Sequence, residues 1–376
     1  MKNYVSKPFG CPEYEFIQAK FDEQAVRSLE RELSVSRIFA RILSSRGLND
    51  PHVARQFLEP SLSRDWKNPL LLPGIDAAAK RVIKALKNNE RICIFGDYDL
   101  DGISATALTL RGLRACGGEV EAILPRRLED GYGITPAAVE RILAKRPQLV
   151  LTVDCGISAG PEIELLRNQG LDVVVTDHHE PGDLMPKDIA IANPKLDPSY
   201  SSDGSQLAGA GVALKLIQAV SSEMGKPNLW HEYVDLATLG TIADVMPLVG
   251  ENRALVATGL EKMRTHPNVG IAALAALAKT PLESITSEKI SFTLAPRLNA
   301  AGRVSSPVDA LRLLLEDDPV TASKLAQILD DHNKTRQMVE ADLSQGVNAL
   351  LERTYHGEPA IVVAGEGWHD GVKGIV

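Results

Sequence analysis

The chain has 376 residues, which at about 150 residues per domain is enough for two or three domains. Its 44% hydrophobic and 24% charged residues are ordinary for a globular protein, and no apolar run reaches the roughly 18 residues of a membrane span. The four cysteines stand singly and the N-terminus lacks the apolar core of a signal peptide, so we expect a reduced, cytoplasmic protein. A net charge of −8 argues against a basic surface that coats nucleic acid, although carboxylates that hold metal ions also count as negative.

The first 72 residues are expected to form a helical region, because Leu33, Ile38, Ile42 and Leu43 recur at helical spacing. The prolines from Pro60 to Pro73 predict a linker after it. Short apolar runs then alternate with amphipathic segments. We expect helices at 75–87, 104–116, 136–145 and 160–170, and strands at 92–95, 120–124, 149–153, 173–176 and 189–192. This alternation predicts an α/β domain with a parallel sheet flanked by helices and buried on both faces.

From Leu207 onward the pattern is nearly all helical. Helices are expected from Gly209, at 234–242, at 268–277 and at 309–315, and then one long helix at 319–355. A helix of that length is expected to connect the α/β domain to another domain. A new strand is predicted at 361–363, and because the chain then stops inside an apolar run, we expect the sequence to be a fragment.

Acidic and imidazole side chains follow three of the predicted strands. The sequence places Asp97, Asp99 and Asp101 after the first strand, Asp154 after the third, and Asp177, His178 and His179 after the fourth. The carboxyl ends of parallel strands form one crevice, so these groups are expected to meet there. Crowded carboxylates repel one another unless cations bind, and oxygen ligands mixed with imidazole suit Mn²⁺, Mg²⁺, Fe²⁺ or Zn²⁺. The set exceeds what one ion needs, which points to two metals about 3.5–4 Å apart, as in phosphoester hydrolysis.

Each piece of this pattern also has a structural explanation. Asp and Gly are common at strand-to-helix turns, Asp154 can cap a turn, and adjacent histidines are more often surface or core residues than ligands. The D-x-D-x-D-G run resembles the start of a calcium loop, but Leu108 stands at the twelfth position, where such a loop needs Glu. The placement of all three pieces at successive strand ends favours the metal site. Cys155 is expected to be a small packing residue.

Four segments together resemble the motifs of the DHH phosphoesterase family, which is named after Asp177-His178-His179. They are GDYDLDG at 96–102, TVDCG at 152–156, TDHH at 176–179 and TIADVMPL at 241–248. Within the family, residues 124–133, 207–213 and 295–303 are similar to its branch of single-stranded-DNA-specific 5′→3′ exonucleases. The resemblance covers residues 75–376, and it implies four regions after the N-terminal one. These are a DHH domain at 73–250, a helical extension at 251–318, a connecting helix at 319–355 and the start of a DHH-associated domain at 356–376.

The resemblance also implies the site residues. The metal ligands would be Asp99, Asp101, Asp154, His178, His179 and Asp244, with Asp97 as a weaker candidate. Asp101, Asp154 and His179 would serve catalysis. Arg127, Arg297, Asn299 and Arg303 would bind substrate, because arginines fork onto phosphates and Asn donates to phosphates or base edges. Residues 295–303, which contain the last three, are expected to form a Gly/Ala-rich loop. The alternative for these arginines is a solvated surface. Gly209 and Gly211 could approach a phosphate, but close helix packing is their more ordinary use.

The activity implied by the resemblance is two-metal hydrolysis that releases nucleotides from the 5′ end of single-stranded DNA in recombination and repair. Mn²⁺ is the favoured ion and Mg²⁺ the alternative. We expect a monomer with single-stranded DNA as its partner, single-strand-binding protein and a helicase as further candidate partners, and no membrane. One rival is a DHH nano-RNase or cyclic-dinucleotide phosphodiesterase, against which residues 124–133 and 295–303 argue. Another is a related scaffold that binds DNA without cutting, against which the complete set of matched ligands argues.

Overall fold

The computed structural model describes residues 19–127, 131, 133–201 and 206–376, and the chain divides after Pro60 into two compact units. The described part of the first unit contains α1 (Glu23–Leu33), α2 (Arg37–Ser45) and α3 (Pro51–Leu58) around a small apolar core. Each helix starts at a side chain that caps its free amides, namely Asp22, Ser36 and Asp50. The helices expected in this region are therefore present.

Residues 61–72 belong to the second unit, so the predicted linker is wrong beyond Pro60. They form α4 (Leu62–Asp65) and the short turn η1 (Pro69–Leu71). Leu62, Trp66 and Leu72 are buried in the core of that unit. The prolines do not keep this segment extended, because Pro69 occupies the first position of a helical turn.

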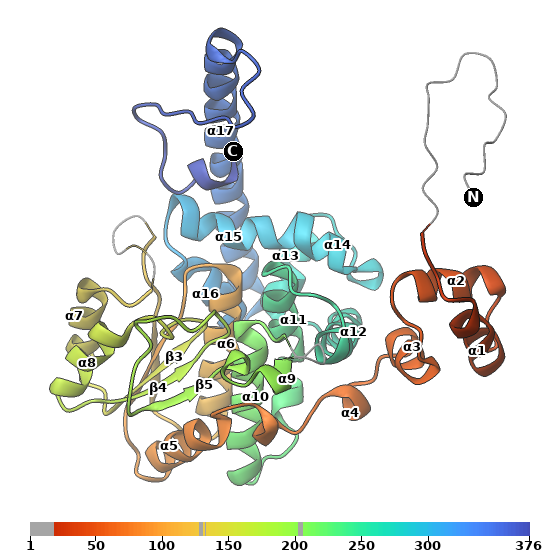
Figure 1. Ribbon diagram of the computed structural model, residues 1–376. Helices are drawn as coiled ribbons and strands as arrows, with labels where there is room; N and C mark the ends of the chain where they lie inside the picture. Colours follow the sequence, from red (N-terminus) through yellow and green to blue (C-terminus); the bar gives the residue numbers. More distant parts are fainter. Residues whose placement is uncertain (1–18, 128–130, 132, 202–205) are drawn as a thin grey trace. The chain divides into compact units, whose positions relative to one another are not determined.

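The second unit is built on one parallel sheet, which confirms the predicted α/β class (Figure 1). Its strands are β1 (Ile92–Phe95), β2 (Val120–Ile123), β3 (Leu149–Val153), β4 (Asp172–Thr176) and β5 (Ala190–Ala192), in the spatial order β2-β1-β3-β4-β5. The three strands with acidic ends, β1, β3 and β4, are therefore direct neighbours.

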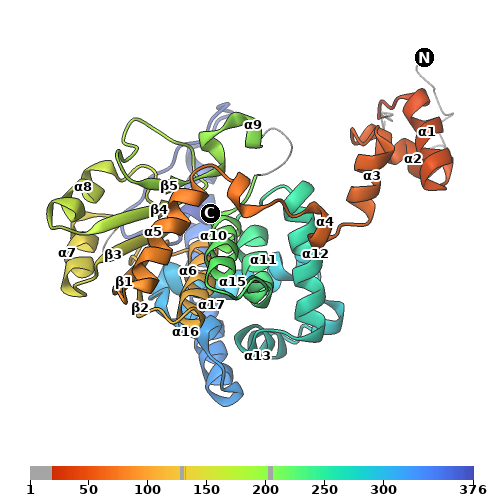
Figure 2. The same cartoon turned by 90° about the horizontal axis from the view of Figure 1, so that it is seen from below.

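Helices cover both faces of the sheet (Figure 2). Along β1, Ile92 and Ile94 pack with α5 (Ile75–Lys87), α6 (Leu100–Ala115) and α10 (Gly209–Glu223). Cys93 and Phe95 point the other way, into the core formed with α7 (Pro136–Ala144) and α8 (Gly160–Asn168). Alternate side chains of a strand face opposite sides, and here both sides are apolar, as in a doubly covered parallel sheet.

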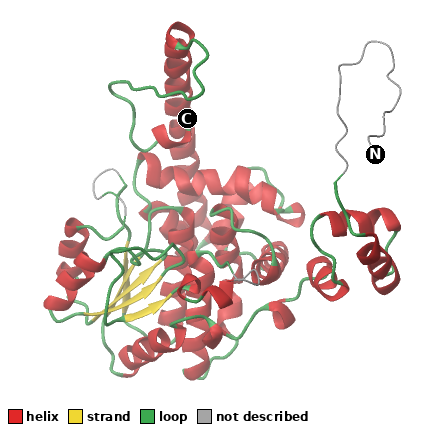
Figure 3. Cartoon of the chain, viewed as in Figure 1, coloured by secondary structure: helices red, strands yellow, loops and turns green. Residues whose placement is uncertain are grey.

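The remainder of the second unit is mainly helical (Figure 3). Its longer helices are α11 (Val234–Ala243), α12 (Gly250–Thr265), α13 (Val269–Leu277), α15 (Ala295–Val304), α16 (Val308–Leu315) and α17 (Pro319–Thr354). Its short pieces are η2 (Pro194–Leu196), α9 (Pro198–Ser201), η3 (Leu229–Tyr233), η4 (Leu282–Ser284), α14 (Ser287–Lys289), the π-helix η5 (Ile290–Leu294) and η6 (Lys373–Ile375). No helix in the described ranges is both long and apolar enough to cross a bilayer.

Two predictions for this half are wrong. Residues 295–303, expected to be a loop, form α15, because Pro296 fits the first turn and the following Leu and Ala residues favour a helix. The strand predicted at 361–363 is absent, and Ile361 and Val362 are exposed there. A strand needs a partner to satisfy its backbone, and among the described residues none pairs with this segment. Its assignment to a DHH-associated domain stays a prediction.

Candidate metal centre

The carboxyl ends of β1, β3 and β4 bring the predicted ligands together, as expected from their order in the sheet. Three overlapping groups have ligand atoms close enough to share an ion, within 4.8 Å of one another. They consist of Asp154, His178 and His179, of Asp101, His178 and Asp244, and of Asp97, Asp99 and Asp154. Every predicted ligand is present in them, including the weaker candidate Asp97.

The turn after β1 is shaped by hydrogen bonds and close packing. Asp99 caps α6, and its carboxylate accepts from the amides of Asp101 (3.0 Å) and Gly102 (3.1 Å). A Cβ at Gly102 would lie 2.6 Å from the Asp97 amide nitrogen, so only glycine lets the helix start so close to the strand end. Asp101 consequently stands in the first helical turn, in a helix that begins four residues earlier than the sequence led us to expect.

Asp101 is held by the N-terminus of α10. Its two carboxylate oxygens accept hydrogen bonds from the amides of Gly209 (2.6 Å) and Ala210 (3.0 Å). A Cβ at Gly240 would overlap the Asp101 carboxylate, and one at Gly209 would overlap that of Asp154. Gly209 therefore allows α10 to approach the carboxylates themselves, which is neither of the two uses we expected for it.

Asp154 lies at the centre of the site. Its backbone has φ 61°, a left-handed conformation, and the residue is 1% exposed. Its Oδ1 atom lies 3.1 Å from His178 Nε2 but lacks a hydrogen-bond partner within the described structure. Asp154 belongs to two of the three ligand groups. A buried carboxylate oxygen without a donor fits a site that a cation completes.

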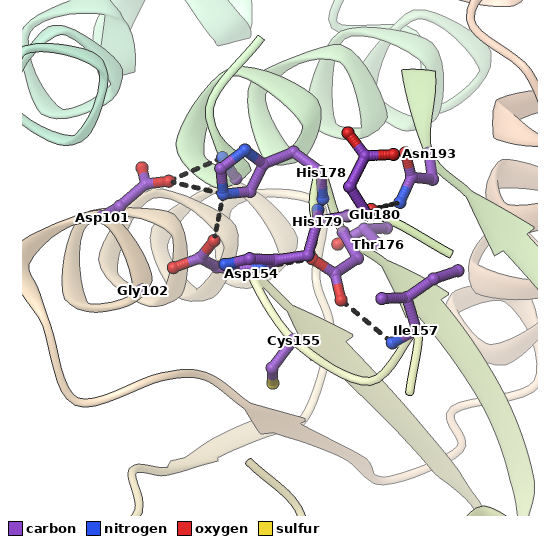
Figure 4. A network of polar contacts seen from close by, with 12 residues as sticks. Asp101, Gly102, Asp154, Cys155, Ile157, Thr176, His178, His179, Glu180 and Asn193 are labelled. Atoms are coloured by element: carbon purple, nitrogen blue, oxygen red, sulfur yellow. Dashed lines mark hydrogen bonds and ion pairs between the residues drawn. The ribbon is translucent and has the colours of Figure 1, made fainter. Parts of the chain in front are cut away.

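The two histidines are oriented by different partners (Figure 4). Asp177 Oδ1 accepts from the amides of His178 (2.7 Å) and His179 (3.1 Å) and lies 2.7 Å from His179 Nδ1. A carboxylate can only accept, so Nδ1 carries the proton and Nε2 is left as the metal-binding atom. His178 Nε2 instead lies near the carboxylates of Asp101 (3.7 Å), Asp154 (3.1 Å) and Asp244 (3.7 Å).

The electrostatics of the site favour a cation. Burial and neighbouring carboxylates raise the pKa of Asp97 to about 7 and that of Asp101 to about 8, and they raise the pKa of Asp154 well above its ordinary value. The same two causes raise the pKa of Asp244 to about 6. The electrostatic repulsion between these carboxylates is relieved when either protons or metal ions bind to them. Only metal ions can at the same time be coordinated by the neighbouring imidazoles.

The pKa values of the two histidines shift in opposite directions. Burial lowers the pKa of His178 to about 4, so it is neutral at pH 7, as a ligand must be. The hydrogen bond to Asp177 raises the pKa of His179. Burial opposes ionisation of Asp177, but the hydrogen bond and charge of His179 lower its pKa overall. Asp177 therefore serves as the charged partner that orients His179. The donor set, the unpartnered Asp154 oxygen and the raised carboxylate pKa values all fit divalent metal ions.

The predicted substrate residues lie in two places. Arg127 is stacked over the Tyr98 ring at 5.0 Å, and burial together with the charges of Arg127 and Arg336 lowers the pKa of Arg303. Arg127 and Arg303 thus gather beside the β1 turn. Residues 128–130 and 132 of the neighbouring segment, on which part of the family resemblance rests, lie outside the described residues.

Arg297 and Asn299 already have partners within the chain. Arg297 Nε lies 2.8 Å from Asp330 Oδ1 of α17, and its Nη1 donates to the Thr293 carbonyl (2.6 Å). Asn299 Oδ1 accepts from the Leu100 amide (2.8 Å), which ties α15 to the start of α6. A phosphate contact by either residue stays a prediction.

Sequence reasoning missed Asn193 and Lys195, which follow β5. The buried Asn193 donates from Nδ2 to the His179 carbonyl (2.9 Å) and accepts from the Lys195 amide (2.8 Å). Lys195 Nζ lies 3.0 Å from Glu180 Oε1, and its charge acts on Asp244 and His178. The available signal was the Asn-Pro pair at the end of a predicted strand, because the predicted ligands also follow strand ends.

Residues 91–241 match the family described as "DHH family, N-terminal domain". Among curated proteins, the single-stranded-DNA-specific exonuclease RecJ of Bacillus subtilis is 38% identical over 355 residues, which cover 94% of this chain and 44% of that protein. RecJ of Dickeya dadantii is 39% identical, over 91% of this chain and 61% of that protein. The chain spans about half the length of the curated relatives it matches.

Solved structures give the same picture. RecJ from Thermus thermophilus in complex with Mn²⁺ matches with a TM-score of 0.80 and 35% identity, covering 94% of this chain and 50% of that one. A second structure, exonuclease RecJ bound to manganese, matches with a TM-score of 0.73 and 40% identity, covering 81% of this chain and 76% of that one. These similarities extend well beyond the 91–241 segment that matches the family.

Proposed function

The chain belongs to the DHH family, in its RecJ group, and from that premise we propose that it removes nucleotides from the 5′ end of single-stranded DNA. The observation that carries the proposal is the meeting of seven acidic and imidazole side chains in three overlapping groups at adjacent strand ends. Relatives at 35% to 40% identity are named single-stranded-DNA-specific exonucleases, and two of the similar structures hold manganese.

We propose two divalent ions as cofactors, with Mn²⁺ favoured and Mg²⁺ the alternative. When bound, such ions neutralise phosphate charge and lower the pKa of water, so that hydroxide is available near neutral pH. Asp99, Asp101, Asp154, His178, His179 and Asp244 would hold them, with Asp97 beside them. The overlap of two ligand groups on Asp154 supports a carboxylate shared between both ions.

The remaining residues position ligands and substrate. Asp177 holds the Nδ1 proton of His179 and thereby presents Nε2 to the site. The amides of Gly209 and Ala210 keep the Asp101 oxygens in place. Arg127 and Arg303 would bind the phosphate of the substrate and offset the charge that develops on its oxygens; their position beside the β1 turn supports this role.

The cellular setting belongs to the same proposal. By likeness to RecJ, we propose a role in recombination and repair, a cytoplasmic location, monomeric action, and partnership with single-strand-binding protein or a helicase. The name of that relative specifies only the exonuclease activity on single-stranded DNA.

The test is digestion of 5′-labelled single-stranded DNA, matched duplex DNA and a dinucleotide with Mn²⁺, Mg²⁺ or EDTA. We expect mononucleotides from the single strand with either metal, slower attack on the duplex, and no product in EDTA. Activity on the dinucleotide alone would instead identify a nano-RNase type of phosphodiesterase. Binding of single strands without cleavage under any metal would indicate a scaffold.

A further inference from the structure

Val245 has a backbone conformation that its side chain disfavours. Its φ is 55°, and it occupies the left-handed position of the turn that ends α11. The Val245 amide donates to the Ile242 carbonyl (3.2 Å) and the Met246 amide to the Thr241 carbonyl (3.2 Å), which is the hydrogen-bond pattern that glycine usually closes. A β-branched residue there is an outlier, because its two γ-carbons crowd the backbone.

The other left-handed residues show how unusual this is. Among the described residues, the remaining non-glycine positions with positive φ are Ser34, Asn89, Arg146, Asp154, Asp188 and Lys279, none of them β-branched. Lys279 ends α13 with the same pair of hydrogen bonds, at 3.1 Å and 2.9 Å, and a φ of 52°. Packing does not compensate Val245, because its side chain is 86% exposed. The fold therefore retains a strained valine without a folding benefit, which directs attention to function.

Val245 directly follows Asp244, whose Oδ2 atom lies 3.7 Å from His178 Nε2 in the candidate metal centre. In the segment after it, Val245, Pro247 and Val249 are exposed whereas the residues between them are less so. We call these three the exposed ridge. The buried Asn252 donates from Nδ2 to the Pro247 carbonyl (3.1 Å), which holds the ridge in place.

We propose that Val245 is a substrate-contacting residue: the exposed ridge carries the sugar and base of the nucleotide whose phosphate lies at the metal centre. The inference rests on the proposed function. Val245 directly follows one of the candidate ligands, so its methyl groups offer an exposed apolar surface next to Asp244 to the sugar or base beside a phosphate held there. Such a contact excludes water and reads no sequence, as an exonuclease without sequence preference requires.

The test compares Val245→Gly with Lys279→Gly, which removes a strained side chain from the same kind of turn away from the ligands. Both variants are expected to melt about 1–3 °C above the wild type, because glycine relieves the strain. With Mn²⁺ and a single strand whose phosphorothioate linkages resist cleavage, only Val245→Gly is expected to bind about 5-fold more weakly by fluorescence anisotropy. Its salt dependence should be unchanged, because no charge is lost. With Mn²⁺, its KM should rise more than its kcat falls, and Val245→Ile should restore binding.

Three results would overturn the inference. If Val245→Gly bound DNA with the same affinity as the wild type, the proposed contact between Val245 and the substrate would be refuted. A lower melting temperature for Val245→Gly would show that the valine serves folding. A wild type that neither binds nor cleaves single-stranded DNA would refute the proposed function itself and the inference with it, and that outcome is visible before any variant is compared.

Discussion

Asp154 combines burial, a left-handed backbone and an unpartnered oxygen in one residue. Asparagine adopts the same conformation readily and has the same size, so it isolates the effect of charge. Burial and the neighbouring carboxylates raise the pKa of Asp154, which means that its charge opposes folding when metal is absent. A bound metal ion would neutralise this charge, which explains why an aspartate stands at this buried position.

We expect Asp154→Asn to lower cleavage of single-stranded DNA more than about 100-fold, because no neighbouring carboxylate can replace a ligand shared by two groups. The melting temperature in EDTA should be equal or higher, and the stabilisation that Mn²⁺ adds should shrink. Asp188→Asn is the control, since Asp188 is exposed and has a similar φ of 56°. Asp154→Asn with more than a tenth of the wild-type rate would contradict the shared-ligand role.

Arg297 offers a second test at this scale, because its ion pair with Asp330 allows a matched variant. If Arg297 contacts a DNA phosphate, Arg297→Ala should weaken single-strand binding and make the negative slope of log K against log[salt] shallower by about 0.7. Asp330→Asn breaks the same ion pair but keeps the guanidinium, so its DNA affinity should be unchanged or higher. Equal losses in both variants would assign Arg297 to fold stability alone.

At the scale of elements, a buried ion pair fastens residues 61–72 to the α/β core. Lys215 of α10 is fully buried, pairs with Glu251 of α12, donates to the Lys67 carbonyl (2.5 Å) and lies 3.6 Å from the centre of the Trp66 ring. Glu251 also accepts from the Lys67 amide (2.8 Å). One pair of charges thus joins three elements that are distant in sequence.

Removing one partner of this pair should leave a buried charge. We expect Lys215→Met to destabilise the protein by about 3–5 kcal/mol in urea unfolding, and the double variant Lys215→Met/Glu251→Gln to cost less than the two single changes added together. The control is Lys80→Met, which breaks an exposed pair with Asp76 and should cost less than about 0.5 kcal/mol. Additive losses would mean that the two charges act independently.

At the scale of the whole molecule, the acidic site makes stability depend on pH. The folded state raises the pKa of Asp97 and Asp101 to about 7 and about 8 from an ordinary value of 3.8, so it binds more protons than the unfolded chain across that interval. Stability from these groups is therefore present at low pH and lost as pH rises through the folded pKa values. His179, whose pKa is also raised, contributes with the same sign.

His178 has the opposite sign, but only between its folded pKa of about 4 and its ordinary value of 6.5. Between about pH 6.5 and 8.5 the metal-free protein should therefore lose about 1–3 kcal/mol of stability. Thermal melting in EDTA measures this loss. Saturating Mn²⁺ should reduce it, because bound ions take the place of the protons. Stability that rises over this interval in EDTA would contradict the raised pKa values.

The sequence alone determined the features that depend on neighbours along the chain. Apolar runs of four or five residues predicted β1, β3 and β4, and the acidic and imidazole residues directly after them predicted the site, because parallel strands end at one edge. Helix α17 was predicted from its period for the same local reason. The ligand set followed from four short segments that match a family.

Only the tertiary structure decided what depends on contacts between distant residues. Asn299 accepts from the Leu100 amide 199 positions away, Lys215 reaches the Lys67 carbonyl 148 positions away, and Gly209 lies against Asp154. No local pattern carries such information, because helix propensity and periodicity report a residue's immediate neighbours and not the surface that later packs against it. The left-handed Val245 belongs to this class too: its sequence favours extended structure, and the hydrogen bonds that close α11 impose the other conformation.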